Sequence, residues 1–161
     1  MNEQDLGPSR PIPTRPARGK IRKITGFGVV MLFVLAFAIF FQRNFSTVMV
    51  RGDSMHATLK NGQRLLATDA YWLVGEIQPN DIVVFRIPGK SEYYIKRVYK
   101  LGGEPVDWLN APRAWKLSAG EYQVPQGMVY VLGDNRSESE DSRIFGPLSP
   151  DQILGKVVVA N

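Results

Sequence analysis

The chain has 161 residues, no cysteine, one histidine and a net charge of +5. The lack of cysteine excludes a disulfide framework, a cysteine nucleophile and a thiolate metal site, and a single histidine excludes a histidine metal cluster. Six of the 20 basic residues but only two of the 15 acidic ones lie in residues 1–41. The basic excess therefore belongs to the N-terminal part, which disfavours a nucleic-acid-binding domain, because such a domain carries its basic patch on the folded body.

The N-terminal part has two sections of opposite character. Residues 1–23 are rich in proline, arginine and glycine, bury too little apolar surface to offset chain entropy, and predict a disordered tail. Residues 24–41 are almost wholly apolar and uncharged, and as a helix they rise about 27 Å, close to the hydrocarbon thickness of a bilayer. We predict a transmembrane helix here. A cleaved signal peptide and a buried core helix are the alternatives, but the stretch is long for the first and apolar on every face, unlike the second.

The charges around this stretch predict its orientation. Six basic residues precede it, and only Arg43 follows closely. The positive-inside rule then puts the tail in the cytoplasm and residues 42–161 outside. We expect a single-pass protein of the plasma or inner membrane with an extracytoplasmic domain over residues 42–161.

Beyond residue 42, short apolar or β-branched runs alternate with glycine and proline. The runs cover residues 46–50, 64–68, 81–86, 93–99, 128–132 and 156–160. Several short strands at this spacing predict a mainly β fold, an antiparallel sheet or barrel-like domain. Residues 71–75 fit a helical turn or a loop.

Ser54 lies in a polar turn after the first of these runs. A serine alone is weak evidence for catalysis, because most serines are surface or turn residues. Its neighbour Asp53 fits turn formation. His56 is a rival base two residues on, although no acidic residue is evidently placed to orient it.

Lys96 stands inside a strand pattern. Alternation puts it on one face with Tyr94 and Val98, both able to pack in a core. From the pattern alone a solvated lysine is the commoner outcome. A desolvated lysine is the alternative, and burial would lower its pKa enough for the neutral amine to take a proton from a serine hydroxyl.

Four stretches, in this order, resemble type I signal peptidases, a family of membrane-anchored serine–lysine endopeptidases. The resemblance covers residues 27–159. Its motifs are Ser54-Met55, the turn and strand over residues 80–85, Tyr94-Ile95-Lys96-Arg97, and a long loop with Gly133-Asp134-Asn135-Arg136, Ser139, Asp141-Ser142-Arg143 and Phe145-Gly146-Pro147. The last is the most specific of the four.

The resemblance implies roles for the matching residues. Ser54 would be the nucleophile and Lys96 the general base, with the Ser54 backbone N–H, in the region of Gly52, contributing to an oxyanion hole. Ser139 would orient the lysine amine. Supporting roles fall to Asp134 and Asn135, which would shape the turn, and to Asp141 and Arg143, which would hold the loop. Substrate-binding roles fall to Met55, Tyr94 and Ile95.

Three departures from the family pattern concern supporting positions. Gly52 stands where some members have a serine or threonine hydroxyl, and Ala57 stands where a proline is common. Residues 101–104 also differ from the usual leucine-proline-glycine-aspartate. The domain is short, so the second β subdomain of some members must be reduced to residues 103–125.

The implied activity is removal of signal peptides from secreted preproteins after small residues, without a metal or organic cofactor. The expected partners are secretory preproteins and the lipid bilayer, with no nucleic acid, and we expect a monomer. Two other classes stay open: a specialised serine–lysine peptidase maturing one conjugation or pilus substrate, and a non-catalytic membrane-anchored β-domain. Trp72, Trp108 and Trp115 fit either a core or a contact with the bilayer surface.

Overall fold

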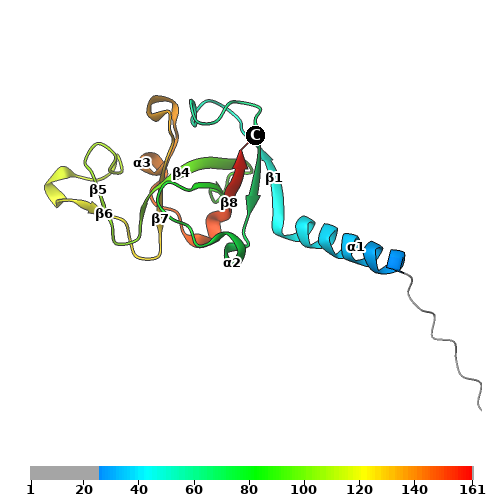
Figure 1. Cartoon of the computed structure of the whole chain (residues 1–161). Coiled ribbons are helices and arrows are strands. Elements are labelled where there is room, and N and C mark those ends of the chain that lie inside the picture. The colour runs from blue at the N-terminus through cyan, green and yellow to red at the C-terminus, as the bar shows by residue number, and fades with distance from the viewer. Residues whose placement is uncertain (1–25, 161) are drawn as a thin grey trace, which may run out of the picture. The chain divides into compact units, whose positions relative to one another are not determined.

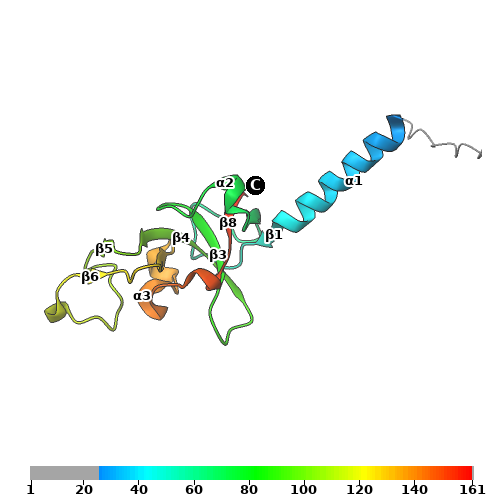
Figure 2. The ribbon, with the colours of Figure 1, turned by 90° about the horizontal axis from the view of Figure 1, so that it is seen from below.

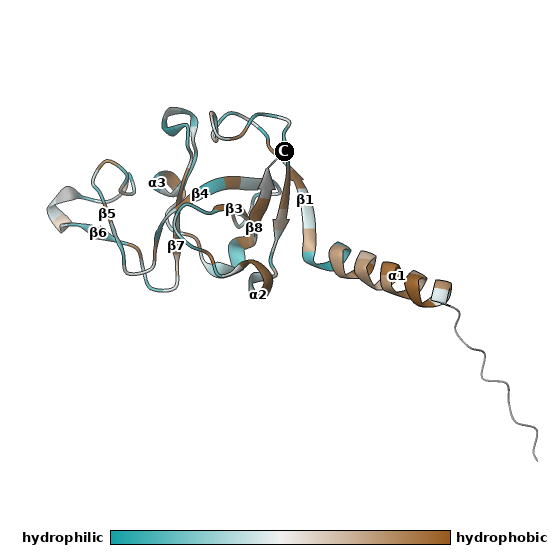
Figure 3. Cartoon of the chain, viewed as in Figure 1, coloured by the Kyte–Doolittle hydropathy of each residue, from teal (hydrophilic) through white to brown (hydrophobic). Residues whose placement is uncertain are grey.

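The computed structural model describes residues 26–160, so the predicted tail over residues 1–23 lies outside the described residues, as does the start of the predicted span. The described residues divide into two units between Leu35 and Ala36, and this boundary falls inside helix α1, Gly26–Asn44. Helix α1 is apolar along most of its length, and none of its residues is buried (Figure 3). By length and composition it is able to cross a membrane, and it runs three residues beyond the predicted end of the span.

The elements after α1 are short (Figure 1). In chain order they are β1 Phe45–Met49, β2 Arg64–Thr68, α2 Tyr71–Val74, β3 Ile82–Arg86, β4 Tyr93–Leu101, β5 Pro105–Val106, the 3₁₀ turn η1 Leu117–Ala119, β6 Tyr122–Gln123, β7 Val129–Leu132, the 3₁₀ turn η2 Arg136–Glu138, α3 Ser142–Phe145, the 3₁₀ turn η3 Pro150–Gln152 and β8 Ile153–Ala160.

Six of the strands form one sheet in the order β1-β2-β8-β3-β4-β7, and every pair in it is antiparallel. The predicted mainly β, antiparallel fold is confirmed. Over the described residues the sheet stays open, with β1 and β7 as its edges, and does not close into a barrel. The C-terminal strand β8 joins the two halves of the sheet, because it pairs with β2 on one side and with β3 on the other.

The predicted strands match those observed, with one clear extension. Strand β8 begins at Ile153, whereas the apolar run predicted a start at residue 156. Gly155 interrupts the apolar run and so concealed this start, and the packing of β8 on β2 requires a glycine there. A Cβ at Gly155 would lie 2.9 Å from the carbonyl oxygen of Thr68 in the neighbouring strand, so only glycine allows the two backbones to approach this closely.

The sheet is covered on both faces, as β3 shows. Val83 and Phe85 face one apolar cluster, and Val84 between them faces another. All three are buried, with exposed fractions of 0–1%. A strand buried on both faces reads as a continuous apolar run, which explains why this segment showed no polar alternation.

A second, two-stranded sheet is formed by β5 and β6. It extends beyond the β4 and β7 side of the main sheet in both ribbon views (Figures 1 and 2). Its apolar residues join Tyr130 and Leu132 of β7 in a third cluster. We call residues 105–123 the small hairpin. It corresponds to the reduced second β subdomain expected over residues 103–125.

Candidate active site

Ser54 lies in the turn that follows β1, and the residues around it fix that turn. Met55 and Leu59 are each 1% exposed and belong to an apolar cluster under the sheet. The Leu59 N–H donates to the Met55 carbonyl at 2.8 Å. The turn is therefore anchored by buried side chains on the C-terminal side of Ser54, while the Ser54 side chain remains half-buried at the surface of the domain.

Lys96 lies on β4 and is 3% exposed. Its Nζ is 2.6 Å from the Oγ of Ser54. Burial lowers the pKa of Lys96 from 10.5 to about 8, because the ammonium form loses its hydration; Asp141, Glu140 and Asp134 oppose this shift. The solvated lysine that the pattern favoured is not what the structure shows.

Two of the three carboxylates that act on Lys96 are already paired with arginines. Asp134 accepts hydrogen bonds from the Nε and Nη2 of Arg97 at 2.9 and 2.7 Å. Asp141 accepts from the Nε and Nη2 of Arg143 at 2.8 and 2.9 Å. A carboxylate neutralised by a bidentate arginine attracts the Lys96 ammonium less strongly. The site therefore keeps acidic groups close to the lysine without cancelling the effect of its burial.

Residues 133–142, which we call the catalytic loop, follow β7 and contact the turn of Ser54; we refer to Ser54 and Lys96 together as the dyad. The Asn135 N–H donates to the Ser54 carbonyl at 3.0 Å. Gly133 packs so closely that an added Cβ would lie 2.6 Å from the same carbonyl and would also overlap the Ser139 side chain. Ser139 is 8% exposed, and its Oγ has no hydrogen-bond partner among the described residues. The hydroxyl predicted to orient the lysine is thus buried beside the turn of Ser54 but is not bonded to Lys96.

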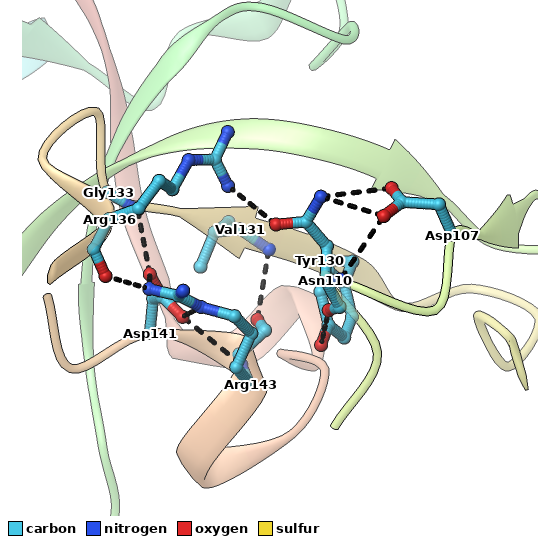
Figure 4. A network of polar contacts seen from close by, with 9 residues as sticks. Asp107, Asn110, Tyr130, Val131, Gly133, Arg136, Asp141 and Arg143 are labelled. Carbon is cyan, nitrogen blue, oxygen red and sulfur yellow. Dashed lines mark hydrogen bonds and ion pairs between the residues drawn. The ribbon is translucent and has the colours of Figure 1, made fainter. Parts of the chain in front are cut away.

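Asp141 holds the base of the catalytic loop (Figure 4). Its side chain is fully buried and accepts the Gly133 N–H at 3.0 Å and the Arg143 N–H at 3.2 Å. Burial alone would raise the pKa of Asp141, but the hydrogen bonds from Arg143 and Gly133 outweigh it and hold that pKa below its usual range. Ser142 adds a second tie to β7, since its Oγ accepts the Val131 N–H at 2.9 Å. Asp141 and Arg143 are thus bonded to each other and to the loop, and their supporting role in catalysis stays a prediction.

A cleft of about 570 Å³ opens at the dyad. It lies between the segment after β1 and the first half of β4, and the catalytic loop borders it. The lining residues are Val50, Arg51, Gly52, Asp53, Ser54, Met55, Ser91, Glu92, Tyr93, Tyr94, Ile95, Lys96, Glu138 and Glu140.

The three predicted substrate-binding residues all line this cleft. Met55 and Ile95 are buried in one apolar cluster and form part of its floor. Tyr94 is partly exposed and stacks on Phe85 with ring centroids 5.7 Å apart. Met55 and Ile95 therefore give the cleft an apolar section beside Ser54 and Lys96.

One edge of β4 is free along the cleft. Strand β7 pairs with β4 only from Arg97 onward, where Leu132 is the partner. Over the described residues, the backbone of residues 93–96 therefore has a neighbour only on the β3 side. An unpaired strand edge is a template for an added strand.

The Ser54 backbone N–H donates no hydrogen bond to any residue that the structure describes. The Gly52 N–H, by contrast, donates to Asn61 Oδ1 at 3.2 Å. Of the two backbone donors in the predicted oxyanion region, only that of Ser54 is uncommitted. Asn61 had no sequence signal beyond its place in a turn.

His56, the rival base, does not line the cleft. Its side chain is exposed, and its backbone N–H closes the turn onto the Asp53 carbonyl at 3.0 Å. Asp53 therefore takes the turn-forming role expected for it. The arrangement brings Lys96, and not His56, to the Ser54 hydroxyl.

Several residues of the site had no predicted role. Glu92, Glu138 and Glu140 line the cleft and make its rim acidic. Tyr93 joins β4 to β1, since its hydroxyl accepts the Met49 N–H at 3.1 Å and donates to the Met49 carbonyl at 2.9 Å. Exposed acidic residues and a strand tyrosine are too common for the sequence to single them out.

Comparison with known proteins places this geometry in a family. The family model described as "Signal peptidase, peptidase S26" matches residues 23–112 and 109–160. The chain belongs to the signal peptidase family, peptidase S26. Membership makes it a hydrolase, a serine peptidase of the signal-peptide-cleaving class, as the motifs indicated.

Individual relatives agree with this assignment. The chain is 35% identical to a signal peptidase I of Bacillus caldolyticus over 70% of this chain and 77% of that protein. It is 31% identical to a signal peptidase IB of Staphylococcus aureus (strain COL) over 67% of this chain and 73% of that protein. Among solved structures, a signal peptidase I from Enterococcus faecalis V583 aligns with a TM-score of 0.41 and 25% identity, covering 52% of this chain and 97% of that one.

Proposed function

We propose that this peptidase is anchored in a membrane by α1 and cleaves secretory preproteins with Ser54 as nucleophile and neutral Lys96 as general base. The observation that carries the proposal is the contact of 2.6 Å between a buried lysine amine and the hydroxyl of a serine in the cleft. With its pKa lowered to about 8, Lys96 is neutral in a useful fraction of molecules near neutral pH. A neutral amine has a lone pair with which to accept the hydroxyl proton.

The steps follow from this geometry. As Ser54 Oγ bonds to the scissile carbonyl carbon, its proton passes to Lys96 Nζ, and the carbonyl oxygen becomes an oxyanion within reach of the free Ser54 N–H. When the intermediate collapses, the C–N bond breaks and the Lys96 ammonium gives the proton to the leaving amine. Water, deprotonated by the again neutral Lys96, then hydrolyses the acyl-enzyme and frees Ser54.

The substrate would bind as an added strand. The free edge of residues 93–96 faces the cleft and offers backbone groups to an extended segment, as in other β-augmentation sites. The buried side chains of Met55 and Ile95 line the cleft and favour apolar side chains before the cut. The preference for small residues there is the part that the family resemblance implies.

The membrane topology is part of the proposal. The charge asymmetry around α1 supports a cytoplasmic N-terminus and an extracytoplasmic peptidase domain in the plasma or inner membrane. A single anchor would confine enzyme and membrane-held preprotein to one surface and raise their effective concentration. We propose a monomer, since the dyad and its supporting residues all come from one chain.

The test uses the full-length protein in detergent and a preprotein with a small-x-small cleavage site. Cleavage at that site should be abolished by Ser54→Ala and by Lys96→Ala, with folding verified by circular dichroism. Lys100→Ala is the matched control, because Lys100 lies on the same strand but is about one-third exposed and pairs with Glu104. Near-normal turnover of the Lys96→Ala protein would refute the base assignment. Cleavage of only one preprotein in a panel would favour a specialised peptidase, and no cleavage by folded wild type would favour a non-catalytic domain.

A further inference from the structure

Asn110, in the small hairpin, uses every polar group of its side chain (Figure 4). Its Nδ2 donates to both carboxylate oxygens of Asp107 at 3.0 Å. Its Oδ1 accepts from Arg136 Nη1 at 3.3 Å, and its backbone carbonyl accepts the Tyr130 hydroxyl at 2.7 Å. Asn110 therefore joins the small hairpin to β7 and to the catalytic loop at once.

Arg136 is the contact point on the catalytic loop. Its guanidinium lies over the Tyr99 ring, 5.6 Å from the centroid, and the Tyr99 hydroxyl bonds to Asp107. The Arg136 carbonyl accepts from Arg143 Nη2 at 2.7 Å. A second link runs beside it, because the Arg113 N–H of the hairpin donates to the Arg143 carbonyl at 2.8 Å. The small hairpin is thus bonded both to Arg136 of the catalytic loop and to Arg143, which directly follows that loop.

The same loop contacts the dyad on its other side. Asn135, directly before Arg136, donates its N–H to the Ser54 carbonyl. Arg143 orders Asp141, and Asp141 holds the Gly133 N–H. Hydrogen bonds at both ends, joined by the covalent link from Arg136 to Asn135, therefore connect the hairpin to the turn of the nucleophile.

We propose that Asn110 is a positioning residue for catalysis: it clamps the small hairpin to Arg136 and so keeps the catalytic loop closed over Lys96. Asn110 touches neither the dyad nor the cleft and acts only through the loop. The proposal rests on the proposed serine–lysine mechanism. It gives the small hairpin a role in setting the state of the general base.

The charges around Lys96 indicate how a looser clamp would change the pKa of Lys96. The charged groups that act on Lys96 are Asp134, Glu140 and Asp141, all from the catalytic loop, and each favours the ammonium form. Only burial opposes them. A loop that opens both admits water to the amine and withdraws these three carboxylates. Because burial is the largest cause of the shift, the pKa of Lys96 then rises toward its usual value. Fewer molecules then hold a neutral base at pH 7, whereas at high pH every molecule does.

The experiment compares the pH dependence of kcat/KM for full-length wild type and Asn110→Ala. We expect the acid limb to move up by about one pH unit, which lowers the rate about tenfold near pH 7 and leaves the rates converging above pH 10. The loss should appear in kcat and not in KM. Glu121→Ala, an exposed change on the same hairpin, should leave the limb in place.

Two further variants separate positioning from folding. Arg136→Ala breaks the same link from the exposed side of the loop and should shift the acid limb in the same direction. The double variant Asp107→Asn/Asn110→Asp exchanges the donor and the acceptor of the hydrogen bond between these two side chains and keeps the net charge. The acid limb of its pH profile should return toward that of wild type.

The outcomes distinguish this inference from the mechanism on which it rests. A pH-independent loss in Asn110→Ala and Arg136→Ala, with the wild-type limb unmoved, overturns the clamp and leaves the dyad standing. A wild-type profile without an acid limb overturns the dyad itself, and the clamp with it. A shifted limb that the double variant restores supports both.

Discussion

A side chain on Gly133 would collide with the carbonyl oxygen of Ser54, because the Cβ would lie only 2.6 Å away. The end of β7 and the turn of the nucleophile are thus in direct backbone contact. That contact fixes the position of Ser54 relative to Lys96, since Lys96 lies on β4, the strand beside β7.

Gly133→Ala should therefore inactivate the enzyme. The methyl group has to displace both the Ser54 backbone and the Ser139 side chain, and a displacement of 1 Å at a catalytic group costs about a hundredfold in rate. We expect kcat to fall by about that factor and the free energy of unfolding to drop by about 1–3 kcal/mol. Steady-state kinetics and thermal unfolding in detergent measure the two effects. Gly120→Ala is a poor control because of its positive φ, whereas Gly26→Ala meets no atom within 4 Å and should be silent.

The activity of the wild type should rise with pH through about 8. Below the pKa of Lys96 the amine is protonated and cannot accept the Ser54 proton, so kcat/KM falls about tenfold for each further pH unit. Above it the base is neutral and the rate levels. A profile measured with a preprotein between pH 6 and pH 10 checks this, and a flat line across that range contradicts a lysine base.

Removing the catalytic amine should make the folded state more stable. The pKa of Lys96 is lower in the folded state than in the unfolded one, so the unfolded state binds more protons and stability increases as pH rises between the two values. Lys96→Met fills the same space without a buried amine, and we expect its free energy of unfolding at pH 7 to exceed that of wild type by about 1–3 kcal/mol. Chemical denaturation at pH 7 and pH 10 measures the difference, which should shrink at the higher pH. A less stable Lys96→Met protein would show that the lysine is not desolvated.

Ser139→Ala should separate catalysis from stability. The Ser139 hydroxyl is buried and has no partner among the described residues, so removing it deletes no hydrogen bond and leaves thermal stability equal or higher. If this hydroxyl orients the Lys96 amine during turnover, kcat should fall about tenfold, less than for loss of Lys96. Unchanged kcat would assign the residue to packing alone. Ser118→Ala, a change at an exposed serine of the small hairpin, is the control.

The sequence predicted the strands of the main sheet well, and the structure places Ser54 beside Lys96, while their catalytic roles stay predictions. Strands such as β2 were visible from their own composition. The burial of Lys96 was not, because it depends on the catalytic loop closing over it from some forty residues away, and alternation within β4 carries no such information. Only the family resemblance indicated it.

Other features were missed because their signals are short. Strands β5 and β6 have two residues each, below the length at which alternation is visible. Helix α3 has only four residues. Asp141 before it accepts the Arg143 N–H and is an N-cap of a residue type that can be recognised in a sequence. Asn110 carried no pattern at all, since its role arises from two segments that meet only in the folded chain.

The position of β8 has a consequence for when the enzyme first becomes active. Ser54 belongs to the β1–β2 half of the sheet and Lys96 to the β3–β4–β7 half, and β8 pairs with both. As the chain emerges from the ribosome, β8 follows all the strands that it unites. Such long-range pairing forms late and slowly. We therefore expect proteolytic activity to appear only after β8 has been inserted between β2 and β3, because until then no strand joins the Ser54 half of the sheet to the Lys96 half.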